Sequence, residues 1–236
     1  MSQYQFVPQD LGPLKVFRLP EPDMVYTIGG DASTGLAKDF SAYQVVSNTM
    51  PFEQVAVFRA KWPIPKVTKF VDQLGRFYNE ALLVQEINYP GNSVQDALLT
   101  FYNYPRNYRA EKRLETDMEI TDKYGFRTTE PSKWMLIGAM LMALEQNNII
   151  VHDPVTIAEL RNFVYIQSKS KAGAAEGFND DTVMALMLAL HGANLYPQII
   201  PRTIIKIEQS VSSDVKSAWK DFRKNLLEPK NEGIIM

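Results

Sequence analysis

Four carboxylates stand where chain elements are expected to begin or end. Asp31 follows a β-prone run and two glycines, Glu86 lies near the end of an apolar run over 81–87, and Asp180 and Asp181 open a helical stretch. Carboxylate oxygens suit Mg²⁺ or Mn²⁺, which also accept water and phosphate oxygens as ligands. Two such ions about 3.5–4 Å apart can activate a water and stabilise the leaving oxygen of a phosphodiester. If the four side chains converge, they therefore predict a two-ion site for phosphodiester hydrolysis.

The elements before Glu86 predict an α/β fold with a mixed sheet. Short β-prone runs over 24–28 and 42–46 flank a turn rich in Gly, Ser, Asp and Thr, and the alternation over 54–62 indicates a third strand. Apolar residues at helical spacing over 67–79 predict a crossover helix into the buried strand 81–87, and a second helix follows over 94–101. In this βββαβα order the first and fourth strands are neighbours, so Asp31 and Glu86 should meet.

The rest of the chain is predicted to add flanking elements to this sheet. We expect a hairpin within 106–125, a helix to about residue 146, a short strand over 149–151, a short helix over 154–163, a small hairpin around 163–173, and a buried helix from 179. Residues 1–23 are rich in proline and predict an extended linker. The domain is then 24–196, and 197–236 form an extension with an amphipathic helix around 211–227.

Asp180 and Asp181 cannot both point the same way, because adjacent residues are about 100° apart around a helix. One is expected to meet the metal, while the other caps the helix or completes the shell of a second ion. Each carboxylate also has a simpler interpretation. The aspartate pair could serve only as a helix N-cap, Asp31 could stabilise its own turn, and Glu86 could form a salt bridge.

Composition excludes several other classes of protein and of chemistry. The 236 residues contain no cysteine and two histidines, so thiol chemistry is excluded and Ser-His-Asp triads lack support. The net charge of −2 excludes a globally basic nucleic-acid binder. There is no P-loop motif for ATP, no signal peptide at the N-terminus, and no apolar run of membrane-spanning length. We therefore expect a soluble chain with no membrane partner.

A local basic region could still bind nucleic acid. Arg106, Arg109 and Arg113 are interleaved with tyrosines over 102–113, a pattern that can track phosphates and stack on bases. A solvated hairpin explains the same residues. Lys133 begins the helix expected near the carboxylates and is a candidate for a phosphate contact, although an ordinary surface lysine is the alternative.

Several motifs in order resemble the C-terminal nuclease domain of the tailed-bacteriophage terminase large subunit. They are Gly-Gly-Asp-Ala-Ser-Thr-Gly at 29–35 with Asp-Phe-Ser-Ala at 39–42, Gln-Glu-Ile-Asn-Tyr-Pro-Gly at 85–91, Gly-Phe-Arg-Thr-Thr at 125–129 with Lys133, and Gly-Phe-Asn-Asp-Asp-Thr-Val-Met-Ala at 177–185. The resemblance covers roughly residues 24–196. It implies a ribonuclease H-like fold and a metal-dependent endonuclease that cuts concatemeric viral DNA during packaging.

The same resemblance implies ligands, partners and a place of action. Asp31, Glu86 and Asp180 would bind Mg²⁺ or Mn²⁺, with Asp181 as a fourth candidate, and double-stranded DNA would be the substrate. The portal and the small terminase subunit would be partners, with the tail after residue 196 as one possible contact, in the cytoplasm of an infected bacterium. The family's N-terminal ATPase domain is absent from this chain, so ATP-driven translocation is not expected of it.

Three other functions compete with this interpretation. A phosphotransferase of the actin and sugar-kinase type shares the sheet, but it needs two such domains around ATP. A DNA-binding or motor-docking module would use the carboxylates only structurally. A junction resolvase of the same superfold would share the metal chemistry but prefer branched DNA.

Overall fold

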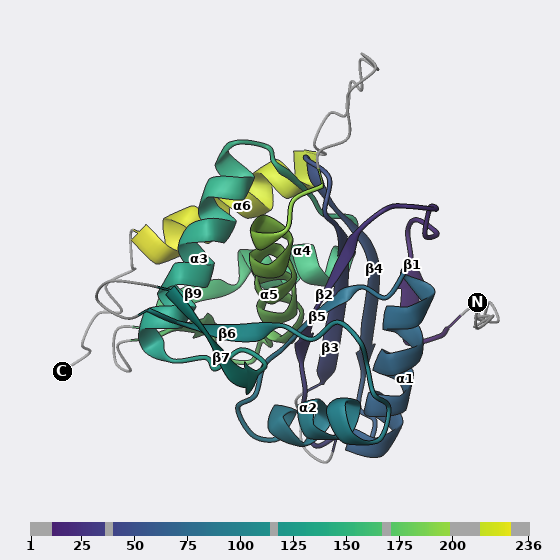
Figure 1. The fold of residues 1–236 in the computed structure, drawn as a ribbon. Coiled ribbons are helices and arrows are strands. Elements are labelled where there is room, and N and C mark those ends of the chain that lie inside the picture. Colours follow the sequence, from purple (N-terminus) through teal and green to yellow (C-terminus); the bar gives the residue numbers. More distant parts are fainter. Residues whose placement is uncertain (1–10, 36–39, 114–117, 167–170, 199–212, 228–236) are drawn as a thin grey trace.

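A six-stranded mixed sheet organises this protein, seen here in a computed structural model that describes residues 11–35, 40–113, 118–166, 171–198 and 213–227. The strand order is β1-β4-β3-β2-β5, and β8 pairs with the start of β4 (Figure 1). The strands of this sheet are β1 (Leu14–Val16), β2 (Tyr26–Asp31), β3 (Ser41–Ser47), β4 (Phe52–Ala60), β5 (Leu82–Gln85) and β8 (Ile149–Ile150).

The central strands follow the predicted βββαβα order. β2, β3 and β4 form an antiparallel meander, helix α1 (Ile64–Phe77) crosses over, β5 pairs parallel with β2, and α2 (Gly91–Thr100) follows. The first and fourth predicted strands are therefore neighbours, as expected. The first strand ends at Asp31, as expected, because Gly29 and Gly30 continue the β-prone run 24–28 and pair with β3 opposite Gln44 and Tyr43.

Helices cover both faces of the sheet (Figure 1). On one face α1 and α2 pack on side chains such as Ile28 and Phe58. On the other face lie α3 (Glu130–Glu145), α4 (Pro154–Arg161), α5 (Asp181–Leu195) and α6 (Ser213–Leu227). Each face has its own hydrophobic cluster, so the sheet is buried from both sides. Burial on both faces explains why strands such as β3 and β5 are buried along their whole length.

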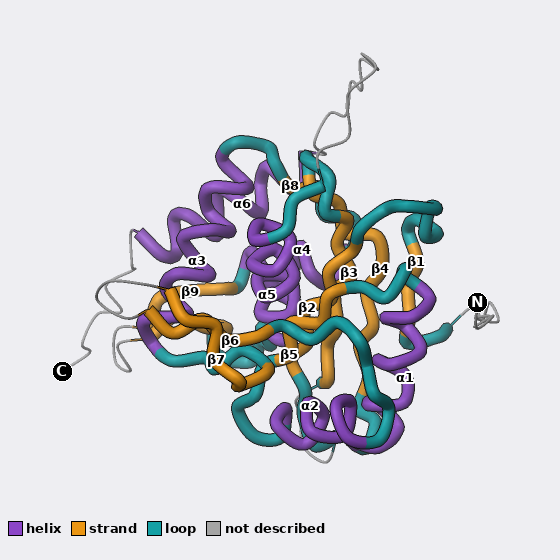
Figure 2. Tube along the Cα trace, viewed as in Figure 1, coloured by secondary structure: helices purple, strands orange, loops and turns teal. Residues whose placement is uncertain are grey.

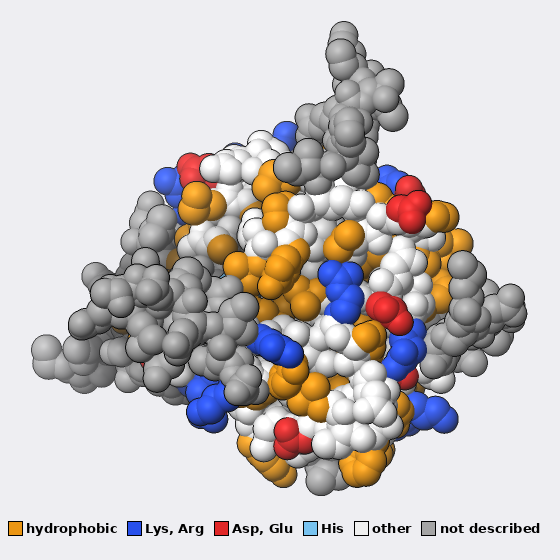
Figure 3. All heavy atoms as spheres, viewed as in Figure 1, with side chains coloured by type: hydrophobic (Ala, Val, Ile, Leu, Met, Phe, Trp, Pro, Cys, Tyr) orange, Lys and Arg blue, Asp and Glu red, His pale blue; other side chains and the backbone are white. Residues whose placement is uncertain are grey.

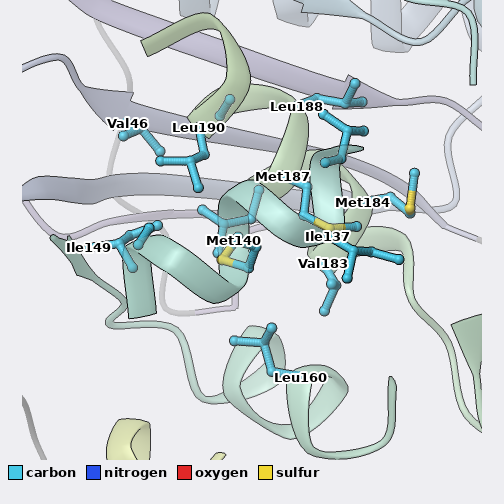
Figure 4. Packing of buried hydrophobic residues seen from close by; sticks show 14 of the residues in the cluster. Val46, Ile137, Met140, Ile149, Leu160, Val183, Met184, Met187, Leu188 and Leu190 are labelled. Carbon is cyan, nitrogen blue, oxygen red and sulfur yellow. The ribbon is translucent and has the colours of Figure 1, made fainter. Parts of the chain in front are cut away.

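Helix α5 is the most deeply buried helix of the second face. It is buried on nearly every side, as predicted. It contacts β2 and β3 of the sheet, and it also packs against α3 and α4. Figure 4 shows Ile137 and Met140 of α3 pointing toward Met187 of α5. The packing holds the beginning of α5, with its two aspartates, in a fixed place over the sheet.

Two antiparallel hairpins extend from this core (Figure 2). β6 (Arg109–Arg113) pairs with β7 (Met118–Tyr124), and β9 (Phe163–Ile166) pairs with β10 (Lys171–Ala174). Both hairpins were predicted from alternation and turn residues. The first emerges next to β5, since the backbone N–H of Tyr108 donates to the carbonyl of Leu83 at 2.8 Å.

The first strand and the last helix that the structure describes, β1 and α6, both pack against the central sheet and its helices. β1 lies within the segment predicted as a linker, but it pairs antiparallel with β4, and Lys15 Nζ contacts the buried Asp153 Oδ1 at 2.7 Å. Four side chains of α6 are buried against the second cluster: Val215, Ala218, Phe222 and Leu226. The helix predicted over 211–227 therefore contributes to the core. None of the helices in the described ranges has the length and apolar character needed to span a bilayer.

Candidate active site

Asp31 and Glu86 lie side by side at the ends of two neighbouring parallel strands. β2 and β5 run parallel with Gly30 opposite Gln85, and the backbone N–H of Glu86 donates to the carbonyl of Gly30 at 2.9 Å. The Gln85 amide donates to the carbonyl of Glu86 at 3.0 Å and accepts from the hydroxyl of Tyr43 at 2.9 Å. These bonds fix the backbone from which Glu86 projects, so the structure brings Asp31 and Glu86 together as the strand order predicted.

Helix α5 brings the other two carboxylates to this edge of the sheet. It crosses β2 so closely that a Cβ atom on Gly29 would lie 2.0 Å from the carbonyl oxygen of Ala185. Ala185 lies about one turn after Asp181, so this contact sets how closely the beginning of the helix approaches the end of β2. Glycine at position 29 is thus a requirement of the site as well as of the fold.

The carboxyl group of Asp31 lies in a strongly anionic environment. Its pKa is raised well above the ordinary value, first by burial, then by the charges of Glu86 and Asp181, by a hydrogen bond with Glu86, and by the charge of Asp180. The residue keeps some contact with solvent, but the protein atoms around it still desolvate its charge. The other three predicted residues therefore all act electrostatically on Asp31.

Asp181 is held from outside its own helix. Its Oδ2 accepts the backbone N–H of Phe40 at 3.2 Å and lies 3.9 Å from Arg59 Nη2. The residue is 8% exposed, and burial together with the charges of Glu159 and Asp180 raises its pKa to about 7, although Phe40 and Arg59 act in the opposite direction. Asp181 therefore does not act simply as a helix cap.

Asp180 faces a lysine across the site. It occupies the N-cap position of α5, but its side chain makes no capping hydrogen bond. Instead its Oδ2 lies 3.7 Å from Lys133 Nζ near the beginning of α3, and a Cβ on Gly173 of β10 would lie 3.3 Å from that same oxygen. Lys133 thus lies beside the carboxylates, as predicted, and the bare backbone of Gly173 leaves them room.

The donor set of this edge fits a divalent cation. Carboxylate oxygens dominate it, and the described ion pairs include none to Glu86. The pKa of Asp31 is raised first by burial and then by the negative charges around it. Within the described ranges, no three acidic or histidine side chains are arranged to hold an ion as they stand. Binding an ion would therefore require these side chains to draw closer together.

No family model matches the sequence, but solved structures of similar fold exist. The large terminase nuclease from thermophilic phage G20c with bound cobalt superposes with a TM-score of 0.62, over 78% of this chain and 89% of its own, at 22% identity. The large terminase nuclease domain of Thermus phage P74-26 gives a TM-score of 0.57 over 77% and 86%, at 20% identity. This chain has the large terminase nuclease fold.

The large terminase nuclease fold is ribonuclease H-like, so the predicted fold class is confirmed, and the resemblance inferred from the motifs agrees with the structural comparison. Further structures of the G20c nuclease contain magnesium or zinc, with TM-scores of 0.62 and 0.57. The G20c nuclease therefore binds cobalt, magnesium and zinc.

The predicted DNA-binding arginines lie on and beside the β6–β7 hairpin of this terminase nuclease fold. Arg109 Nη2 donates to the hydroxyl of Tyr124 at 2.8 Å, so its side chain is engaged within the hairpin. Arg106 is exposed, and Arg113 lies on β6 with its side chain outside the described part. Figure 3 shows Lys and Arg side chains in separate patches on the visible face, not in one continuous stripe. Their contact with DNA stays a prediction.

Two residues beside the carboxylates, Arg59 and Glu159, were not among the predicted site residues. Arg59, in β4, lies with its Nη2 3.4 Å from Oε1 of Glu159, in α4. Glu159 Oε2 in turn accepts the backbone N–H of Thr182 at 2.8 Å and also the Thr182 hydroxyl. The one signal in the sequence was a charged residue, Arg59, near the end of β4 after the apolar run 55–58, but nothing there connected it to a glutamate 100 residues away.

Proposed function

We propose that this chain is a divalent-metal-dependent DNA endonuclease that cuts concatemeric phage DNA during genome packaging. The observation that carries the proposal is the gathering of Asp31, Glu86, Asp180 and Asp181 at one edge of a sheet with the large terminase nuclease fold. Burial and the charges of the other three raise the pKa of Asp31, and perturbed carboxylates of this kind cluster at functional sites. The divalent ions held by the G20c nuclease support the same proposal.

The four carboxylates would hold one or two Mg²⁺ or Mn²⁺ ions. When bound, such ions lower the pKa of water and neutralise charge on the phosphate and the leaving oxygen. Asp31 and Glu86 supply oxygens from strand ends fixed by the β2–β5 pairing. Asp180 and Asp181 supply theirs from the beginning of a helix that the core holds in place.

Lys133 is the residue that we assign to substrate phosphate. Its Nζ lies 3.7 Å from Asp180 Oδ2, and only 17% of its side chain is exposed. The ammonium group is therefore held beside the carboxylates and does not extend into bulk solvent. A lysine in that position can attract a phosphate toward the carboxylates, which would otherwise repel it. Arg106, Arg109 and Arg113 would extend the contact along the DNA backbone.

The partners and the place of action follow from the family resemblance. We propose that the chain works with the portal, the small terminase subunit and an ATPase domain, in the cytoplasm of an infected bacterium. A resolvase of the same superfold and a docking module with structural carboxylates are the competing functions.

Incubation of the purified chain with supercoiled plasmid in EDTA, Mg²⁺ and Mn²⁺ tests the proposal. We expect nicking and linearisation in the metal-containing samples and none in EDTA. Linear duplex and four-way junctions of equal length run in parallel separate the alternatives, since a resolvase would prefer the junction. A folded chain that binds DNA but cleaves nothing with either ion would favour the docking module.

A further inference from the structure

We propose that Arg59 is a positioning residue for the Asp181 carboxylate, and that it thereby increases the affinity of the site for a divalent ion. The inference rests on the proposed function, because it concerns how the same site is prepared for its ion. Arg59 comes from β4, two strands away from the end of β2, and would not itself touch the ion or the DNA. Its contacts supply the argument.

Arg59 lies between two carboxylates of different roles. Its Nη2 is 3.4 Å from Glu159 Oε1 and 3.9 Å from Asp181 Oδ2. Glu159 is 6% exposed and already anchors the first turn of α5 through the backbone N–H and hydroxyl of Thr182. The arginine therefore ties the carboxylate of Asp181 to the same anchor that holds its helix.

The ring of Phe40 keeps the guanidinium in this place. The guanidinium carbon lies 3.5 Å from the centre of the ring, close enough for a cation–π contact. The backbone N–H of the same residue donates to Asp181 Oδ2 at 3.2 Å. Phe40 and Arg59 together thus restrain one oxygen of Asp181. Its Oδ1 makes no hydrogen bond or ion pair with the described residues and is available to an ion.

Outer contacts of this kind orient metal ligands, and their loss typically lowers metal affinity by about 10–100-fold. The opposite effect is also physically possible, since a guanidinium near a ligand repels a cation. The ion pair with Glu159 neutralises much of that repulsion, so we expect positioning to dominate. The direction of the change in affinity therefore decides between the two.

The test is calorimetric titration of Mn²⁺ into the DNA-free protein. Arg59→Met should weaken Mn²⁺ binding by about 10–100-fold. Arg59→Lys keeps the charge without the planar guanidinium, so its Mn²⁺ affinity should lie between those of the wild type and Arg59→Met. Lys61→Met is the matched control. It removes a cation whose Nζ lies 4.6 Å from the same Phe40 ring but makes no described contact with Asp181, so it should stay within about twofold of wild type.

Cleavage kinetics give a second readout. At saturating Mn²⁺ the Arg59→Met variant should recover most of the wild-type rate, because Asp181 itself is intact. If that variant does not fold, Glu159→Gln, which keeps an acceptor for Thr182, should weaken Mn²⁺ binding in the same direction. Unchanged or tighter binding in a folded variant would overturn the inference while leaving the nuclease proposal in place. A wild-type chain that neither binds Mn²⁺ nor cleaves DNA would remove both.

Discussion

Replacing Asp181 with asparagine should stabilise the metal-free protein at pH 8, although the same change should impair cleavage. The pKa of this carboxyl rises from 3.8 to about 7 on folding, chiefly because of burial. At pH 8 the folded protein must keep the group ionised, and the difference in pKa corresponds to about 4 kcal/mol of lost stability. The amide carries no charge, so it avoids this loss.

Part of the gain should be offset. The pKa of about 7 already includes the opposing effects of the Phe40 hydrogen bond and of Arg59, so these are not counted again. The amide does place N–H donors where a carboxylate oxygen stood, and burying a donor without a partner costs about 1–3 kcal/mol. Arg59 keeps Glu159 as its partner, so no buried cation is left alone. We therefore expect a net gain of about 2 kcal/mol, or roughly 4–8 °C in Tm for a domain of this size.

The pH dependence has a definite sign. When folding raises the pKa of a carboxyl group, the folded protein is most stable below the ordinary pKa, where the group is neutral in both states. That stability is lost as the pH rises through the pKa of the folded state. The advantage of Asp181→Asn should therefore be full above about pH 7 and vanish near pH 4. Urea unfolding in EDTA between pH 4.5 and 8 measures it, with Asp214→Asn, on a side chain that is 77% exposed, as the control. An advantage of equal size at every pH would show that the charge of Asp181 does not cause the instability.

Three further predictions concern other parts of the molecule. Gly29→Ala should destabilise the protein by about 1–3 kcal/mol or more and reduce cleavage, because its Cβ would overlap the carbonyl oxygen of Ala185. Urea unfolding and plasmid cleavage measure the two effects, and an unchanged free energy of unfolding would contradict the close packing. Lys133→Met should slow cleavage at limiting DNA but change the free energy of unfolding by less than about 1 kcal/mol; an unchanged cleavage rate would remove its assignment to phosphate. Phe222→Ala should cost about 3–5 kcal/mol in urea unfolding, whereas a loose C-terminal extension would show no such loss.

The sequence predicted the elements that local patterns define. Alternation and turn residues located β3 and both hairpins, and helical spacing located α1, α3 and α5, because each signal lies within a few neighbouring residues. The order of these elements was enough to place Asp31 beside Glu86, since the crossover makes β2 and β5 neighbours. That step needed only the topology of the sheet.

Features that depend on distant contacts were missed. β1 has three residues among prolines, and it is a strand only because β4 offers it an edge. The Arg59–Glu159 pair joins β4 to α4, and no local pattern connects residues so far apart. The sequence also left open how Asp180 and Asp181 divide their roles, because the answer depends on Phe40 and Lys133, which come from other elements.

The most direct test of the central claim is plasmid cleavage in Mn²⁺ by wild type, Asp31→Asn and Glu86→Gln, with circular dichroism to show that all three are folded. We expect cleavage by the wild type alone and none in EDTA, because each variant replaces a carboxylate at this edge of the sheet with an uncharged amide. Cleavage at the wild-type rate by either folded variant, or cleavage that persists in EDTA, would contradict the claim that these carboxylates form the metal site of a nuclease.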